Sequence, residues 1–149
     1  MKLKRKLLQK DQPLVIRNPN STRPYQHVLE PLFTYLTIAA VQAKDNSKAG
    51  FYNVGPDECD CVTTGDLVEL FGKYYGNQFK TEINHDPNAP HEANFLKLDT
   101  SLVKATFGWK PNWHIEKAIE KTVEWTKAWL AGEDVDAVMG KQIGEFIRI

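Results

Sequence analysis

The 149-residue sequence has little cysteine, no excess of either charge and no long apolar run. Two cysteines are too few for the disulfide framework of a small secreted domain, which favours a reducing cytoplasm. Lys plus Arg and Asp plus Glu both total 19, so the chain is not built to neutralise many phosphates. No apolar stretch approaches the roughly 20 residues that a membrane-spanning helix needs. We therefore expect a cytoplasmic protein that binds neither nucleic acid nor membranes.

The motifs of several enzyme classes are also missing. There is no glycine-rich dinucleotide loop, no Walker loop and no Gly-x-Ser-x-Gly elbow. None of the five tyrosines has a lysine four residues later, which excludes a Tyr-x-x-x-Lys proton-transfer pair. Cys59 and Cys61 stand alone, without a second pair or a suitable histidine beside them in the sequence. We therefore assign no catalytic residue, no cofactor-binding residue and no metal ligand.

What is present alternates between strand and helix patterns, which indicates an α/β or α+β class. Short strands are predicted at 14–17, 51–54, 79–83 and 95–98, and a short extended piece at 25–28. This is thin for a complete parallel sheet. Residues 1–10 are basic, without the apolar core of a signal peptide, and their leucine spacing predicts the end of a helix. A helix that starts at Met1 without a cap suggests that an N-terminal part is missing.

Five further helices are predicted, and two of them have informative features. The helix at 31–44 is apolar almost all round, which is typical of a helix buried on more than one side. Thr63 and Asp66 form a capping-box pattern ahead of an apolar stripe that ends near Gly76. The other three are predicted at 99–108, 115–131 and 134–146; the last is weakened by two glycines.

Two loop segments contain candidate binding residues. The first includes Arg17, Arg23 and Tyr25, and a guanidinium presents a donor fork that matches phosphate oxygens. The alternative for Arg23 is a surface ion pair. The second contains His91 and Glu92, and a carboxylate suits two vicinal hydroxyls such as those of ribose. The alternative there is an ordinary polar loop.

The remaining histidines and tryptophans favour structural roles. His27 fits a core histidine bonded to the backbone, and His114 fits a helix-cap position. Trp125 and Trp129 lie four residues apart on one helix and so share a flank, which is typical of core or interface packing.

Four strings in order carry a resemblance to a known family: VIRNPNSTRPYQHVLEPL, FYNVGP, PHEANFLKLD and FGWKPNWHIEKAIEKTVEWTKAWLAGED. Together they resemble the C-terminal half of the CDP-glucose 4,6-dehydratases, of the extended short-chain dehydrogenase/reductase (NAD-dependent epimerase/dehydratase) superfamily. Arg-x-Tyr-x-His-Val and Gly-Trp-x-Pro are shared with many nucleotide-sugar enzymes of this superfamily. The Ile-Arg-Asn-Pro and Pro-His-Glu-Ala strings are more particular to the dehydratases.

The resemblance implies a fold and a division of the chain. It implies an extended short-chain dehydrogenase/reductase fold, of which residues 1–149 would be the small substrate-binding α/β domain plus a stray Rossmann helix and strand. The segment 25–54 would pack on a Rossmann body that this chain does not contain. The family binds NAD, which this chain alone could not hold. A separately encoded N-terminal half is therefore one expected partner.

The resemblance also implies an activity and a set of contacts. The family is a lyase that converts CDP-glucose to CDP-4-dehydro-6-deoxyglucose and water, a precursor of deoxysugars in O-antigen lipopolysaccharide. Arg23 and Tyr25 would contact the diphosphate, the strand ending at Arg17 would border the base, and Glu92 with His91 would meet the ribose. Relatives often place an arginine just before that acid, and here this contact is lost or made by His91. We expect the chain alone to be inactive. The alternatives are a non-catalytic CDP-sugar-binding or complementing half, a relict without function, and a relative acting on another nucleotide sugar.

Overall fold

The computed structural model describes residues 13–84 and 94–148, so the helix predicted within 1–10 lies outside the described residues. In chain order the elements are β1 (Leu14–Ile16), α2 (Leu29–Gln42), the 3-10 helices η1 (Asn46–Lys48) and η2 (Glu58–Asp60), α3 (Thr64–Tyr75), β2 (Thr81–Ile83), α4 (Ser101–Phe107), α5 (Ile115–Ala131) and α6 (Val135–Ile147). Helices thus combine with a small sheet, which is compatible with the predicted α/β class.

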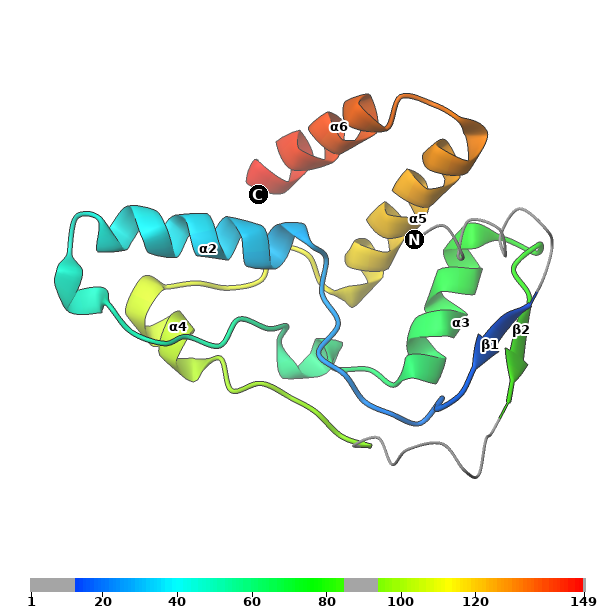
Figure 1. Cartoon of the computed structure of the whole chain (residues 1–149), viewed down its shortest axis with the longest axis horizontal. Coiled ribbons are helices and arrows are strands. Elements are labelled where there is room, and N and C mark those ends of the chain that lie inside the picture. The colour runs from blue at the N-terminus through cyan, green and yellow to red at the C-terminus, as the bar shows by residue number, and fades with distance from the viewer. Residues whose placement is uncertain (1–12, 85–93, 149) are drawn as a thin grey trace.

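The sheet consists of β1 and β2, paired in parallel with Leu14 opposite Thr81 and Ile16 opposite Ile83. Both strands fall within the predicted ranges 14–17 and 79–83. Figure 1 shows α3 between this sheet and α5. Parallel neighbours need a crossover connection, and here it is long, because it includes α2 and α3.

Two predicted strands are wrong, and a third piece is only partly extended. Residues 51–54 form no strand, and the side chain of Phe51 is 99% exposed. Residues 95–98 contribute one isolated bridge, from Phe95 to Thr22. The piece at 25–28 ends in a turn, because Val28 has helical backbone angles. A strand is stable only beside a partner edge, which residues 51–54 do not find within the described part of the chain.

The main apolar core lies between α3 and α5. Tyr75, Ile119 and Val123 form its buried centre, and Phe71 and Phe79 pack around them. The predicted capping box begins α3: the Thr63 hydroxyl accepts the Asp66 N–H, and the Asp66 carboxylate accepts the Thr63 N–H. This local signal and the amphipathic stripe explain why α3 forms where the sequence predicts it.

Helices α4, α5 and α6 also occupy their predicted positions. Gly108 and Gly132 end α4 and α5 in the left-handed region, with φ of 63° and 76°, where side chains other than glycine are strained. The Trp125 and Trp129 rings stack at 5.8 Å on one flank of α5, as their spacing predicts. None of the helices within 13–84 and 94–148 has the length and apolar character needed to span a bilayer.

Helix α2 buries polar side chains and exposes apolar ones. Its two buried residues are polar: Glu30 and Thr34, one turn apart. Large apolar residues of the same helix are exposed, among them Leu36 at 70%. Others of this exposed face are Leu32, Phe33 and Tyr35. The predicted burial of this helix on more than one side is therefore not found within the described chain, where much of its apolar surface is uncovered.

Candidate functional site

The first candidate segment leads from β1 to α2. Arg17 is exposed immediately after β1. Arg23 is half-buried, and its Nη1 donates to the carbonyl of Thr22 at 2.8 Å. The Tyr25 hydroxyl lies 2.8 Å from the Thr64 hydroxyl at the start of α3. Backbone and side-chain bonds therefore hold Arg23 and Tyr25 in place.

Thr22 joins this segment to two other parts of the chain. It forms an antiparallel bridge with Thr63 and a parallel bridge with Phe95. Its N–H donates to the Asn94 carbonyl at 2.9 Å, and its carbonyl accepts the Leu96 N–H at 3.1 Å. Asn94 follows Glu92 by two residues, so the backbone next to Arg23 is paired with the backbone just after the second candidate pair.

The second candidate pair, His91 and Glu92, belongs to residues 85–93, which the structure does not describe. His91 and Glu92 lie outside the described residues, so their roles stay predictions. What the structure brings together is Thr22, next to Arg23, and Asn94, two residues after Glu92.

A groove of about 480 Å³ opens between the sheet and α3. Ile16, Pro19 and Phe79 contribute apolar wall, and Asp66 and Glu69 contribute carboxylates. None of the described residues that line it is a lysine or an arginine. Two carboxylates without a cation repel a diphosphate, so this groove is a poor place for one.

The start of α2 and the connector before α5 form a buried polar and aromatic cluster. Glu30 Oε1 accepts the backbone N–H groups of Asn112 and Trp113 at 3.0 and 2.7 Å. Burial raises the pKa of Glu30, and these two bonds partly oppose that shift. The His27 ring meets the Trp113 ring edge-on at 4.9 Å, and His27 Nδ1 accepts the Leu29 N–H. His27 is 8% exposed, and together with this bond its burial confirms the predicted core histidine bonded to the backbone. Burial, with a smaller effect from Lys121, lowers the pKa of His27.

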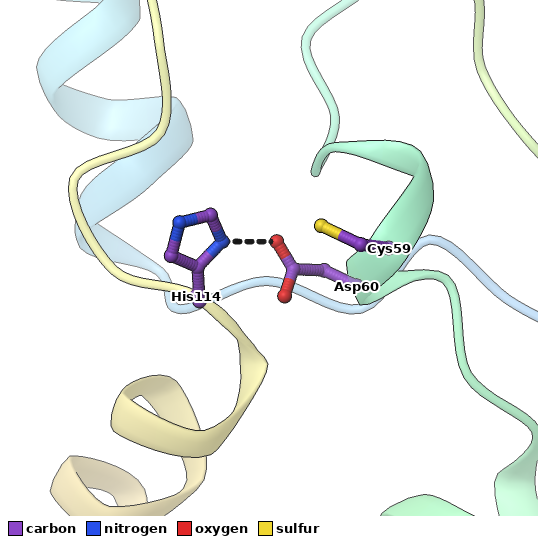
Figure 2. Close-up of side chains that lie close together, drawn as sticks. All are labelled: Cys59, Asp60 and His114. Carbon is purple, nitrogen blue, oxygen red and sulfur yellow. Dashed lines mark hydrogen bonds and ion pairs between the residues drawn. The ribbon is translucent and has the colours of Figure 1, made fainter.

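His114 occupies the predicted cap position of α5, but the cap itself comes from elsewhere. The buried Asp60 carboxylate accepts the Ile115 N–H through Oδ1 at 2.9 Å. Its Oδ2 lies 2.8 Å from His114 Nδ1, and this bond raises the pKa of His114. Figure 2 shows the Cys59 side chain beside this pair. Potential ligand atoms of Cys59, Asp60 and His114 all lie within 4.8 Å of one another.

Sequence reasoning missed this triad because His114 is far from Cys59 along the chain. The residues of η2 and the start of α5 come together only through the tertiary fold. The polar role of Glu30 was missed in the same way, since its partners are more than 80 positions away. The Cys59-x-Cys61 spacing was the one visible signal, and it lacked a nearby histidine in the sequence.

No protein-family model matches the chain. A curated CDP-glucose 4,6-dehydratase from Salmonella typhimurium (strain LT2) is 35% identical to it over 138 residues. The match covers 92% of this chain and 38% of the relative, so the chain spans well under half of the relative's length. The resemblance indicated by the sequence motifs is thereby confirmed: over nearly its whole length, this chain is similar to a CDP-glucose 4,6-dehydratase.

Proposed function

We propose that the chain holds the nucleotide-sugar side of a CDP-glucose 4,6-dehydratase cleft within an extended short-chain dehydrogenase/reductase fold. The similarity to the Salmonella enzyme supports this reaction class. The observation that carries the proposal is the pairing of Thr22 with Asn94, because it joins the two segments that contain the candidate contacts. A binding site assembled from two distant strings needs such a junction.

Each candidate residue has a distinct task in this proposal. Arg23 and Tyr25 bind the diphosphate, since a guanidinium offers charge-assisted donors and the phenol a further hydrogen bond. The chain around Arg17 borders the cytosine. Glu92 accepts the ribose hydroxyls, and His91 makes the phosphate contact that an arginine makes in relatives.

The reacting groups would come from another part of the enzyme. In this class a bound NAD would supply the redox chemistry, by accepting and returning a hydride during loss of water from the sugar. This chain has neither the glycine-rich loop nor the Tyr-x-x-x-Lys pair for that chemistry. Its own residues bind and orient the nucleotide sugar, so the 149-residue polypeptide alone is inactive and depends on a separate N-terminal half.

The apolar face of α2 is where that half would dock. The segment 25–54 contains this helix and Phe51, and both present large uncovered apolar side chains. Contiguous exposed apolar surface marks an interaction site more often than a free surface. We place the complex in the cytoplasm, which suits the free thiols of Cys59 and Cys61, and its product in O-antigen precursor synthesis.

Calorimetric titration with CDP-glucose tests the proposal. The chain is titrated alone and after mixing with the part of the Salmonella relative that it does not match. R23A should weaken binding by roughly 10–100-fold, because it removes charge-assisted bonds to the diphosphate. R148A, at an exposed arginine after α6, is the control and should bind as the parent does.

Three outcomes separate the alternatives. Binding by the chain alone at full strength supports a non-catalytic sugar-binding module. Tighter binding of UDP-glucose than of CDP-glucose moves the function to another nucleotide sugar. If neither the chain nor the mixture binds a nucleotide sugar, the proposed function is wrong.

A further inference from the structure

We propose that Cys59, Asp60 and His114 form a binding site for a zinc-type divalent cation. This inference is independent of the nucleotide-sugar proposal and concerns the junction between η2 and the start of α5. The three side chains offer a sulfur, a carboxylate oxygen and an imidazole nitrogen within 4.8 Å of one another (Figure 2). Such a mixed set is unlike an acidic surface cluster, because each ligand has a different chemistry.

The spacing is close to what a tetrahedral ion requires. Zinc binds sulfur at about 2.3 Å and imidazole nitrogen or carboxylate oxygen at about 2.0–2.2 Å, which puts its ligand atoms roughly 3–4 Å apart. The largest separation here, at most 4.8 Å, exceeds that range only slightly. Cys59 and His114 are exposed and can close the gap by rotating their side chains.

The Asp60 carboxylate is held in one orientation, and it positions the proposed site. It is only 4% exposed, and its Oδ1 is engaged by the Ile115 N–H. That bond orients the carboxylate so that Oδ2 faces His114, as hydrogen bonds around metal sites orient their ligands. When an ion binds, it takes the place of the proton between Oδ2 and Nδ1. The imidazole and the Cys59 thiol release their protons to solvent.

The donor set selects the class of metal. Magnesium and calcium prefer oxygen ligands alone, whereas thiolate and imidazole suit zinc and its neighbours. Three protein ligands leave one position for water. The ion would tie η2 to the first turn of α5.

Cys61 provides a matched control. It is two residues from Cys59, but its Sγ donates to the Asp57 carbonyl at 3.7 Å and it does not belong to the triad. C59S and C61S each replace one sulfur with an oxygen. The two variants should therefore bind metal differently only if the site uses Cys59 and not Cys61.

The test is a titration of the tag-free 149-residue chain with Co²⁺ and then Zn²⁺, followed by absorption. We expect one equivalent of Co²⁺ to give a thiolate charge-transfer band in the near ultraviolet, and Zn²⁺ to remove it. C59S should abolish the band and C61S should retain it. H114Q should weaken Co²⁺ binding at least about tenfold, since loss of even an outer partner of a ligand costs about 10–100-fold. Far-UV circular dichroism of each variant verifies folding.

The proposal is overturned if the parent chain gives no thiolate band at one equivalent. It is equally overturned if a folded C59S variant keeps the band, or if C61S loses it as C59S does. Neither result bears on CDP-glucose binding, so failure of the metal site is distinguishable from failure of the proposed function.

Discussion

At the scale of single residues, Glu30 departs most from what its position suggests. It lies in a helix with an apolar sequence, yet it is 2% exposed and holds two backbone N–H groups of the connector before α5. A buried carboxylate is tolerated only when hydrogen bonds compensate for its lost hydration. Here a single oxygen, Oε1, accepts both bonds, and it thereby links α2 to the connector.

Replacing Glu30 with alanine should destabilise the fold strongly. E30A leaves the N–H groups of Asn112 and Trp113 without their acceptor, which costs about 2–4 kcal/mol of unfolding free energy. E30Q keeps an oxygen at the Oε1 position and should cost less. Urea denaturation measures both, with E133A at an exposed acid as the control. Equal losses for E30A and E30Q would show that the two accepted bonds are not what stabilises the fold.

His27 should make stability depend on pH. Burial lowers its pKa from 6.5, so the unfolded chain takes up a proton at a higher pH than the folded chain does. The free energy of unfolding should therefore fall as the pH drops below 6.5. H27N retains an acceptor for the Leu29 N–H but cannot titrate, so its profile should be flatter over this range.

Two other charged groups, Lys121 and Glu30, also affect how stability depends on pH. The quantity to compare is therefore the difference between the stability profiles of the parent and of H27N. Lys121 also lowers the pKa of His27, and Glu30 has a raised pKa that makes stability rise as the pH falls. Both are present in the parent and in H27N, so subtracting the two profiles isolates His27. An NMR titration that finds the His27 pKa at or above 6.5 would refute this explanation.

At the scale of elements, α5 and α6 are joined by a charged network. Lys121 is buried and pairs with Glu124 and Glu145, and Lys141 from α6 reaches Glu124 at 2.9 Å. Gln142 adds a bond to the Lys121 carbonyl. A buried lysine is favourable only with such partners, because an unpaired buried charge is expensive.

Glu124 should confer stability that is lost in acid. Hydrogen bonds from Lys141 and Lys121 lower the pKa of Glu124 to about 2, although partial burial opposes the shift. Its contribution is therefore complete above 4.5 and disappears as the pH falls toward 2. E124Q should lose unfolding free energy at neutral pH and show a shallower acid transition. E116Q, also on α5 but in an exposed pair with Lys73 of α3, should change neither. Matching acid transitions for E124Q and the parent would contradict this.

The elements also show what the sequence could and could not predict. Helices α3, α5 and α6 were predictable because caps, stripes and terminal glycines act within a few residues. The strands predicted at 51–54 and 95–98 do not form, because a strand depends on a partner that local sequence does not specify. The same limit applies to the site: Arg23 and Tyr25 could be nominated from a motif, but the contact between Cys59 and His114 arises only from the fold.

At the scale of the whole molecule, α2 leaves much of its apolar surface uncovered by the rest of the described chain. An aromatic series connects it to the rest: the Phe33 ring meets Phe146 at 5.7 Å, and Phe146 meets Trp113 at 5.0 Å. Beyond that contact the face with Leu32 and Leu36 stays exposed. At about 25 cal/mol per Å² of apolar surface, covering such a face is a substantial driving force for association. This is why we propose a partner for the chain.

The most direct test is a product assay on the chain with NAD and CDP-glucose, alone and with the remaining part of the Salmonella relative. Each preparation is first checked for CDP-glucose binding, so that an inactive sample is recognised. We predict no CDP-4-dehydro-6-deoxyglucose from the chain alone, and product from the mixture that falls when Arg23 is replaced by alanine. Turnover by the chain alone would contradict the claim that its residues only bind and orient the nucleotide sugar.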